Sequence, residues 1–372
     1  MKNKLLIIPL LSLVFLSGCS LDFNVKKKDS VDMTDNGGVY VSTDQGQRWV
    51  HMTKMPDVSG NKSIGYINVR ELSVDPNDAQ AIYLASYDLG LYYTYNIAKG
   101  WQKADKLGSS TILDVVVDPK DKCTIYATVS NKVLRSVDCN RSWEQVYLDP
   151  NPGVKVTAIA IDHYDTSNIY VGTSNKDMFK SIDNGRSWKR IKIFKGAIED
   201  IIINPSDSRD IFVVSSGNNL YRFSSDSIPS FEELSRFPNR LETSDLPNLK
   251  NNFEGIDIGK NFVDLKFSKD SSVIIWATNK FLIRSNDGGL SWEKIDLLTA
   301  ANKSDILAMD FNVSNPDEIY YGTKSVFVRS LDGGLSWTVV DLPTARMTSD
   351  IVVDQSDPRA IYLGVRQQPE VK

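Results

Sequence analysis

Short apolar segments recur along the chain, and each is followed at a fixed distance by a second one. In all seven cases the first segment ends in a polar residue, and an Ile that opens an Ile-Tyr-like pair stands seven positions later. The polar ends and their partners are Asp75 and Ile82, Asp118 and Ile125, Asp162 and Ile169, Asn204 and Ile211, Ser268 and Ile275, Asn312 and Ile319, and Asp354 and Ile361. Short runs between turn residues are typical of β-strands, so each pair predicts an inner strand, a loop and a second strand.

A second pattern, Ser-x-Asp-x-Gly-x-x-Trp, punctuates the same units. Five segments share it, with Asn140 in the glycine position of one: residues 42–49, 136–143, 181–188, 285–292 and 330–337. Asp138 and Asp183 are 45 residues apart, as are Asp287 and Asp332, and gaps of 94 and 104 residues each hold one degraded copy, at 95–101 and 224–231. Units of this length with four short strands predict an all-β fold, a seven-bladed β-propeller of four-stranded blades.

The two ends of the chain each supply half of one blade. The last unit has strands at Ile351–Val353 and Ile361–Val365, and the first has strands at Val39–Val41 and Trp49–Met52. Joined, they make a seventh blade with two-plus-two closure, which removes open sheet edges. We therefore expect the propeller to span residues 37–366, followed by a tail at 367–372.

The residue types of the repeated motif favour a turn scaffold over catalysis. Asp and Gly suit a tight turn, the Ser and Asp oxygens share hydrogen bonds with the turn's own amides, and the Trp buries a large face between neighbouring sheets. Six of the seven tryptophans lie at this position, Trp276 being the exception. The scaffold residues of the five full copies are Asp44, Trp49, Asp138, Trp143, Asp183, Trp188, Asp287, Trp292, Asp332 and Trp337.

The first residues form a processing segment. Lys2 and Lys4 precede an apolar run at 5–16, and the segment Leu16-Ser17-Gly18-Cys19 looks like the lipobox of bacterial lipoproteins. This resemblance implies that residues 1–18 are a signal peptide and that Cys19 is lipidated. Residues 19–36 then form the lipidated N-terminus and a polar tether. The expected location is the cell envelope, on the outer membrane where the cell has one and otherwise on the outer leaflet of the cytoplasmic membrane.

The net charge and the cysteine and histidine content indicate which partners, cross-links and metal sites to expect. The formal net charge of −4 becomes −6 without Lys2 and Lys4, so no nucleic-acid partner is expected. Antiparallel pairing about Asn131 places Cys123 opposite Cys139, which predicts a disulfide. With only two histidines and no His/Cys cluster, no metal site or cofactor is expected, apart from a cation at the acidic positions described below.

The Ser-x-Asp-x-Gly-x-x-Trp segments resemble the BNR or Asp-box repeats, and the resemblance covers nearly all of the chain after the tether. That superfamily includes sortilin-type ectodomains, two-propeller xyloglucanases and propeller lipoproteins that assist photosystem II assembly. Sialidases share the box but add an arginine triad and an Arg-Ile-Pro element early in the chain. Here the segment Arg236-Phe237-Pro238 is only weakly similar to that element, and it lies in the middle of the chain.

A single propeller with a lipid anchor looks most like the assembly-factor group. The resemblance implies a non-catalytic protein-binding or assembly module of the envelope, anchored to the membrane, with an envelope protein as partner. One alternative is a glycoside hydrolase or carbohydrate-binding propeller of the xyloglucanase type, for which two carboxylates would be required. Another is a purely structural envelope protein.

Acidic residues gather at one position of the repeat. Four residues before the polar end of each inner strand stand Glu71, Asp114, Ala158, Asp200, Asp264, Ala308 and Asp350, five of them acidic. Inner strands line the central channel, so the acidic ring (Glu71, Asp114, Asp200, Asp264 and Asp350) is predicted at one channel mouth. The loops 53–66 and 232–256 enter at the same face, where binding sites are common. Two interpretations remain: each acid binds amides of the next blade, or the face binds a cation or a basic segment.

Overall fold

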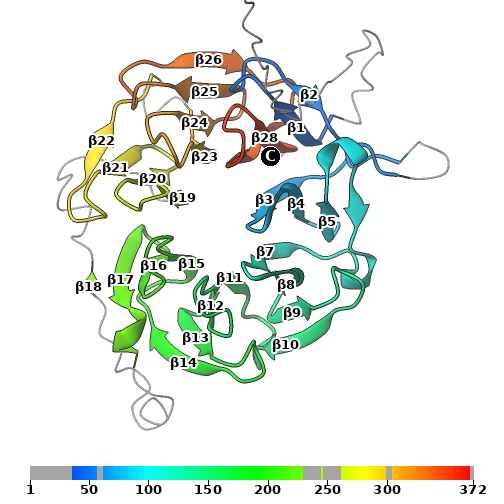
Figure 1. Ribbon diagram of the computed structural model, residues 1–372, viewed down its shortest axis with the longest axis vertical. Helices are drawn as coiled ribbons and strands as arrows, with labels where there is room; N and C mark the ends of the chain where they lie inside the picture. Colours follow the sequence, from blue (N-terminus) through cyan, green and yellow to red (C-terminus); the bar gives the residue numbers. More distant parts are fainter. Residues whose placement is uncertain (1–35, 57–61, 229–243, 246–260, 299–303, 369–372) are drawn as a thin grey trace, which may run out of the picture. The chain divides into compact units, whose positions relative to one another are not determined.

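The computed structural model describes residues 36–56, 62–228, 244–245, 261–298 and 304–368. Within this part the chain forms seven four-stranded antiparallel sheets arranged as the blades of a propeller, so the predicted fold class is confirmed (Figure 1). Three 3-10 helices of three residues each lie between strands of the described part. None of the described helices is long and apolar enough to span a membrane.

Six blades run from an inner strand to an outer strand in chain order. The first three blades are β3 (Val69–Asp75), β4 (Asp78–Ser86), β5 (Leu91–Thr94) and β6 (Gln102–Lys103); β7 (Ile112–Asp118), β8 (Asp121–Val129), β9 (Lys132–Ser136) and β10 (Glu144–Leu148); and β11 (Val156–Ile161), β12 (Ile169–Thr173), β13 (Asp177–Ser181) and β14 (Lys189–Ile193). The next three are β15 (Ile198–Ile203), β16 (Asp210–Ser215), β17 (Asn219–Ser224) and β18 (Ser244–Asp245); β19 (Phe262–Phe267), β20 (Ile274–Thr278), β21 (Leu282–Ser285) and β22 (Glu293–Ile295); and β23 (Ala308–Phe311), β24 (Ile319–Gly322), β25 (Val326–Ser330) and β26 (Thr338–Asp341).

The seventh blade combines the two ends of the described chain. Its strand order is β2 (Val50–His51), β1 (Gly38–Ser42), β28 (Ile361–Arg366) and β27 (Met347–Val353). β1 pairs with β28 over five residues, from Gly38 opposite Val365 to Ser42 opposite Ile361. Backbone hydrogen bonding between the chain ends therefore completes the ring of blades.

The core lies between adjacent sheets. The second strands of the blades are apolar on both faces, and β12, β20 and β24 are buried at every position. The outer strands are more exposed, and in β26 three of the four residues are exposed. Close inter-blade packing requires small residues at some points: a Cβ on Gly172 would lie 2.3 Å from the side chain of Ile198 in the next blade.

The inner strands share a repeated irregularity. In six blades the pairing with the second strand shifts by one residue directly before one position, occupied by Glu71, Asp114, Ala158, Asp200, Asp264 and Asp350. A β-bulge re-aims the side chain that follows it. In five blades that side chain belongs to the acidic ring, so the bulges help to set its geometry.

Candidate functional site at the channel mouth

The Asp boxes are saturated with internal hydrogen bonds. In the fifth blade, Ser285 Oγ donates to Asp287 Oδ1 (2.8 Å), and the Ser291 hydroxyl and amide donate to the two oxygens of the same carboxylate at 2.6 and 2.8 Å. The bonds from Ser291, followed by the bond from Ser285, lower the pKa of Asp287 to about 2. Asp44, Asp138, Asp183 and Asp332 accept equivalent bonds. A carboxylate held ionised in this way is unsuited to donate a proton.

Three tryptophans of the repeat donate a hydrogen bond to the preceding blade. The indole Nε1 of Trp188 donates to the carbonyl of Val146 in β10 (2.9 Å), and Trp337 Nε1 donates to Asp296 O (2.8 Å) in the same inter-blade arrangement. Trp101 in the degraded copy does likewise with Met52 O (2.8 Å). Trp101 is fully buried, whereas Trp49, Trp143, Trp188, Trp292 and Trp337 are half-buried. These contacts are structural.

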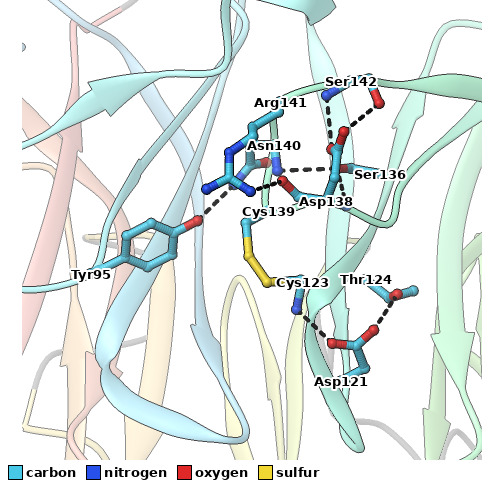
Figure 2. Close-up of a disulfide and its surroundings, with 10 residues drawn as sticks. All are labelled: Tyr95, Asp121, Cys123, Thr124, Ser136, Asp138, Cys139, Asn140, Arg141 and Ser142. Carbon is cyan, nitrogen blue, oxygen red and sulfur yellow. Dashed lines mark hydrogen bonds between the residues drawn. A yellow bond between two sulfur atoms is a disulfide. The ribbon is translucent and has the colours of Figure 1, made fainter.

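Cys123 and Cys139 form a disulfide, but the strand pairing that predicted it differs from the pairing in the structure. Val129 pairs with Lys132, so the hairpin turns one residue away from the predicted register, and Cys139 lies in the Asp-box turn rather than opposite Cys123 within a strand pair. Cys139 N donates to Cys123 O (3.1 Å), a contact made by the equivalent turn residues Gln45, Asn184, Gly288 and Gly333 in other blades. Figure 2 shows the disulfide joining the turn to the start of β8.

The acidic ring lines the central channel, a cavity of about 970 Å³. Its five members come from blades that are distant in sequence, and all five side chains are half-buried there. The sequence prediction omitted several charged residues here, among them Lys266, which lines the channel, and Asp310, which is buried and acts on Lys266 through its charge. Lys266 and Asp310 stand two positions further along their inner strands than Asp264 and Ala308, so counting a second row of inward positions would have found them.

Three carboxylates connect neighbouring blades through backbone amides. Leu72 N donates to Asp350 Oδ2 (2.6 Å), Ile159 N to Asp114 Oδ2 (2.8 Å), and Val353 N to Asp310 Oδ2 (2.8 Å). The interpretation that the acids bind amides of the next blade is therefore correct for Asp114 and Asp350. These side chains hold the ring of blades together.

Asp200 and Asp264, on adjacent blades, differ from those three. Each accepts a hydrogen bond from the amide that follows it in sequence, Ile201 N and Leu265 N respectively, both at 2.7 Å. Among the described residues, no amide of a neighbouring blade donates to either carboxylate. Lys266 Nζ lies 3.3 Å from Asp264 Oδ2 as an ion pair. Among the four aspartates of the ring, Asp200 and Asp264 are thus the two that no amide of another blade binds.

Protonation varies around the channel. Burial, followed by the negative charges of Asp114 and Asp264, raises the pKa of Asp200 to about 7. Burial also raises the pKa of Asp350 to about 7, that of Asp114 to about 6 and that of Glu71 well above its usual range. The charge of Asp264, followed by those of Asp310 and Asp350, raises the pKa of Lys266. Near neutral pH the channel therefore combines partly protonated carboxyl groups with the ammonium group of Lys266.

The channel offers little to a metal ion in the described residues. No group of three or more His, Cys, Asp or Glu side chains in that part of the chain is arranged to hold one. Backbone amides, Lys266 and the guanidinium of Arg70 offset the crowded negative charge here.

Comparison with known proteins gives matches of two kinds. The model of the photosynthesis system II assembly factor YCF48 family matches residues 248–358. A curated relative is xyloglucanase Xgh74A of Acetivibrio thermocellus, 22% identical over 331 residues that cover 73% of this chain and 37% of the relative. A xyloglucanase of Paenibacillus sp is 26% identical over 211 residues, covering 45% of this chain and 20% of the relative.

Solved structures show the same two groups. The GH74 xyloglucanase from Xanthomonas campestris has a TM-score of 0.61 at 14% identity, covering 81% of this chain and 51% of the enzyme. YCF48 bound to a D1 peptide has a TM-score of 0.56 at 14% identity, covering 82% of this chain and 94% of that protein. The chain thus spans about half of the solved enzyme and a smaller share of the curated ones. With the repeats and blades above, these likenesses place the chain among the BNR-type β-propellers.

The relatives correct the functional prediction. The sequence predicted a non-catalytic protein-binding or assembly module and no enzymatic activity. The curated proteins that this chain matches over most of its length are xyloglucanases, and several structural neighbours are GH74 enzymes. The prediction was wrong because it took the single propeller and lipid anchor as decisive. The findings favour the alternative, a propeller of the xyloglucanase type.

Proposed function

We propose that this chain is a glycoside-hydrolase propeller that acts on a β-glucan of the xyloglucan type at the channel mouth. The relatives support the class of substrate. The observation that carries the proposal is the pair formed by Asp200 and Asp264, two carboxyl groups on adjacent blades that line one cavity, of which Asp264 forms an ion pair with Lys266.

Glycosidases require one carboxylic acid and one carboxylate on either side of the scissile bond. Asp200 is the proposed acid, because its pKa of about 7 leaves it largely protonated at mildly acidic pH. Its proton passes to the leaving glycosidic oxygen. Asp264 is the proposed carboxylate, because Lys266 pairs with it. It accepts a proton from the attacking water or attacks the sugar itself, according to the separation of the two groups around the bound glycan.

The test is hydrolysis by the full chain of xyloglucan, mixed-linkage β-glucan and a soluble cellulose derivative. We expect reducing ends from xyloglucan, and a loss of activity of at least about 100-fold in Asp200→Asn and in Asp264→Asn. Asp350→Asn is the matched control, because an Asn oxygen can still accept the bond from Leu72 N and Asp350 is not among the charges that raise the pKa of Asp200. Equal activity in all three variants, or no hydrolysis of any glucan by the folded protein, would contradict the proposal.

The location of the protein belongs to the same proposal. The lipobox-like segment ending at Cys19 supports a lipid anchor in the cell envelope, where a polysaccharide outside the cytoplasm would be accessible. Residues 1–35 lie outside the described structure, so this part rests on the sequence.

A further inference from the structure

Two arginines and a tyrosine form a second group of side chains at the channel. Arg70 belongs to β3, Tyr87 follows β4, and Arg366 ends β28, and all three line the same cavity as the acidic ring. The guanidinium carbons of Arg70 and Arg366 lie 5.8 and 5.3 Å from the centre of the Tyr87 ring. One aromatic ring therefore holds two cationic groups in place, a favourable cation–π arrangement.

The arginines have unused hydrogen-bonding capacity. Arg70 donates from Nε to Leu113 O (3.0 Å), and Arg366 Nε is buried without a hydrogen-bond partner in the described part of the chain. Neither guanidinium lies within 4.0 Å of a carboxylate among the described residues, in contrast to Arg209, Arg284 and Arg359. Burial raises the pKa of the nearby Glu71 and Asp114, the charge of Arg70 lowers these pKa values only in part, and neither carboxylate forms an ion pair with Arg70. A buried guanidinium N–H group without an acceptor destabilises the folded protein unless a bound anion accepts its hydrogen bond.

The placement of this group relative to Asp200 and Asp264 suggests the ligand. Figure 1 shows β3 and β28 on one side of the central opening and β15 and β19 on the other. A sugar chain positioned on Asp200 and Asp264 would extend across the mouth toward the arginines. The planar fork of a guanidinium matches a carboxylate through two parallel hydrogen bonds.

We infer that Arg70 and Arg366 form a subsite for the carboxylate of an acidic sugar, so that the natural substrate is a glucan or related glycan bearing uronic-acid groups. The glycan in this inference rests on the proposed function. The inference that the glycan carries an acidic group rests on the positions of the two arginines and Tyr87.

The experiment compares binding of two oligosaccharides of equal length to the full chain by calorimetry, one neutral and derived from xyloglucan, the other carrying glucuronic acid. We expect the acidic probe to bind at least about tenfold more tightly at low salt, with the difference shrinking as salt is added. Arg70→Gln with Arg366→Gln should remove the difference and leave neutral binding unchanged. Arg366→Gln alone should remove part of it, and it leaves the Arg70–Leu113 bond intact if the double variant unfolds. Arg359→Gln, in an exposed ion pair with Asp357, is the control.

The outcomes separate this inference from the proposed function. Cleavage of neutral xyloglucan with equal affinity for both probes overturns the acidic subsite and leaves the hydrolase proposal standing. Arginine-dependent binding of the acidic probe without cleavage of any glycan supports the subsite and removes the hydrolase. An acidic peptide that binds through the same arginines, with no binding of either sugar, overturns the inference.

Discussion

The indole Nε1 of Trp188 donates a hydrogen bond of 2.9 Å to the backbone carbonyl of Val146, and the two residues belong to different blades. Val146 lies in the outer strand β10 of the second blade, and Trp188 follows the Asp box of the third. The ring of Trp188 also packs edge-on against Tyr147, with centroids 5.5 Å apart. The box tryptophan is thus the contact that fixes the outer edge of one blade to the next.

Replacing Trp188 therefore tests the role of the repeat. Trp188→Ala removes both the ring contact and the inter-blade hydrogen bond, and we expect a loss of about 2–4 kcal/mol in the free energy of unfolding. Trp188→Phe keeps most of the ring contact and should cost about 1 kcal/mol. Denaturant unfolding measures both. Glycan binding at the channel mouth should not change in the folded protein, and an unchanged unfolding midpoint for Trp188→Ala would refute this role.

Removal of the disulfide should destabilise the protein, and the loss should depend on which residue replaces Cys139. Removing the disulfide opens the loop between Cys123 and Cys139, whose sequence separation is 16, and should destabilise the protein by about 3 kcal/mol. Cys139 has a φ of 55°, a conformation that Asn tolerates better than Ser. Cys123→Ser with Cys139→Asn reproduces the Ser167 and Asn184 pair of the third blade, so it should lose less stability than Cys123→Ser with Cys139→Ser.

Thermal unfolding of the two double variants, beside the wild type with and without reductant, measures this difference. Titration of the unfolded, non-reduced protein should detect neither Cys123 nor Cys139 as a free thiol. Two free thiols, or identical midpoints for the two double variants, would contradict the account of the Asp-box turn given above.

The sequence carried enough information for the fold and for part of the site. The seven-residue spacing between polar strand ends and Ile-Tyr-like pairs is local, so it located the blades and the acidic ring. The sequence did not predict a role for Lys266, because the charges that act on it belong to Asp264, Asp310 and Asp350, and two of these residues lie in other blades. The amide partner of Asp350 is Leu72, 278 residues away. The protonation of the channel carboxyl groups and their hydrogen-bond partners depend on such contacts between blades, and a local sequence pattern does not predict these contacts.

The anchor makes a prediction that is independent of the propeller. Cys19→Ala removes the thiol that would carry the diacylglyceryl group, so the protein should leave the membrane fraction and lose labelling by a fatty-acid analogue. Cys19→Ser serves as a second variant of nearly unchanged size. Glycan hydrolysis by the released protein should match that of the anchored form. Labelling that persists in both variants would place the lipid elsewhere or exclude it.

The buried acids predict how stability depends on pH. The pKa of Asp200 is about 7 in the folded protein and near 3.8 in the unfolded chain, so between these values the folded state holds a proton that the unfolded chain has lost. The resulting stabilisation is complete below about pH 4 and disappears as the pH rises through 7. Asp350, with a pKa also near 7, behaves in the same way. Asp200 is half-exposed to the channel, where water screens its charge, so we expect an effect of about 1–2 kcal/mol.

Asp200→Asn should therefore raise the unfolding midpoint at pH 8 and change it little at pH 5, because Asn mimics the protonated acid. Asp350→Asn should do the same less strongly, since the ionised carboxylate of Asp350 accepts a bond from Leu72 N. Asp287→Asn should have the opposite sign: its pKa is lowered to about 2, so its charged form stabilises the fold above about pH 4. Thermal unfolding of the three variants between pH 4 and 9 measures these slopes. A ring acid that stabilised the fold more at pH 8 than at pH 5 would be a structural anion, and Asp200 would then lose its standing as the proton donor.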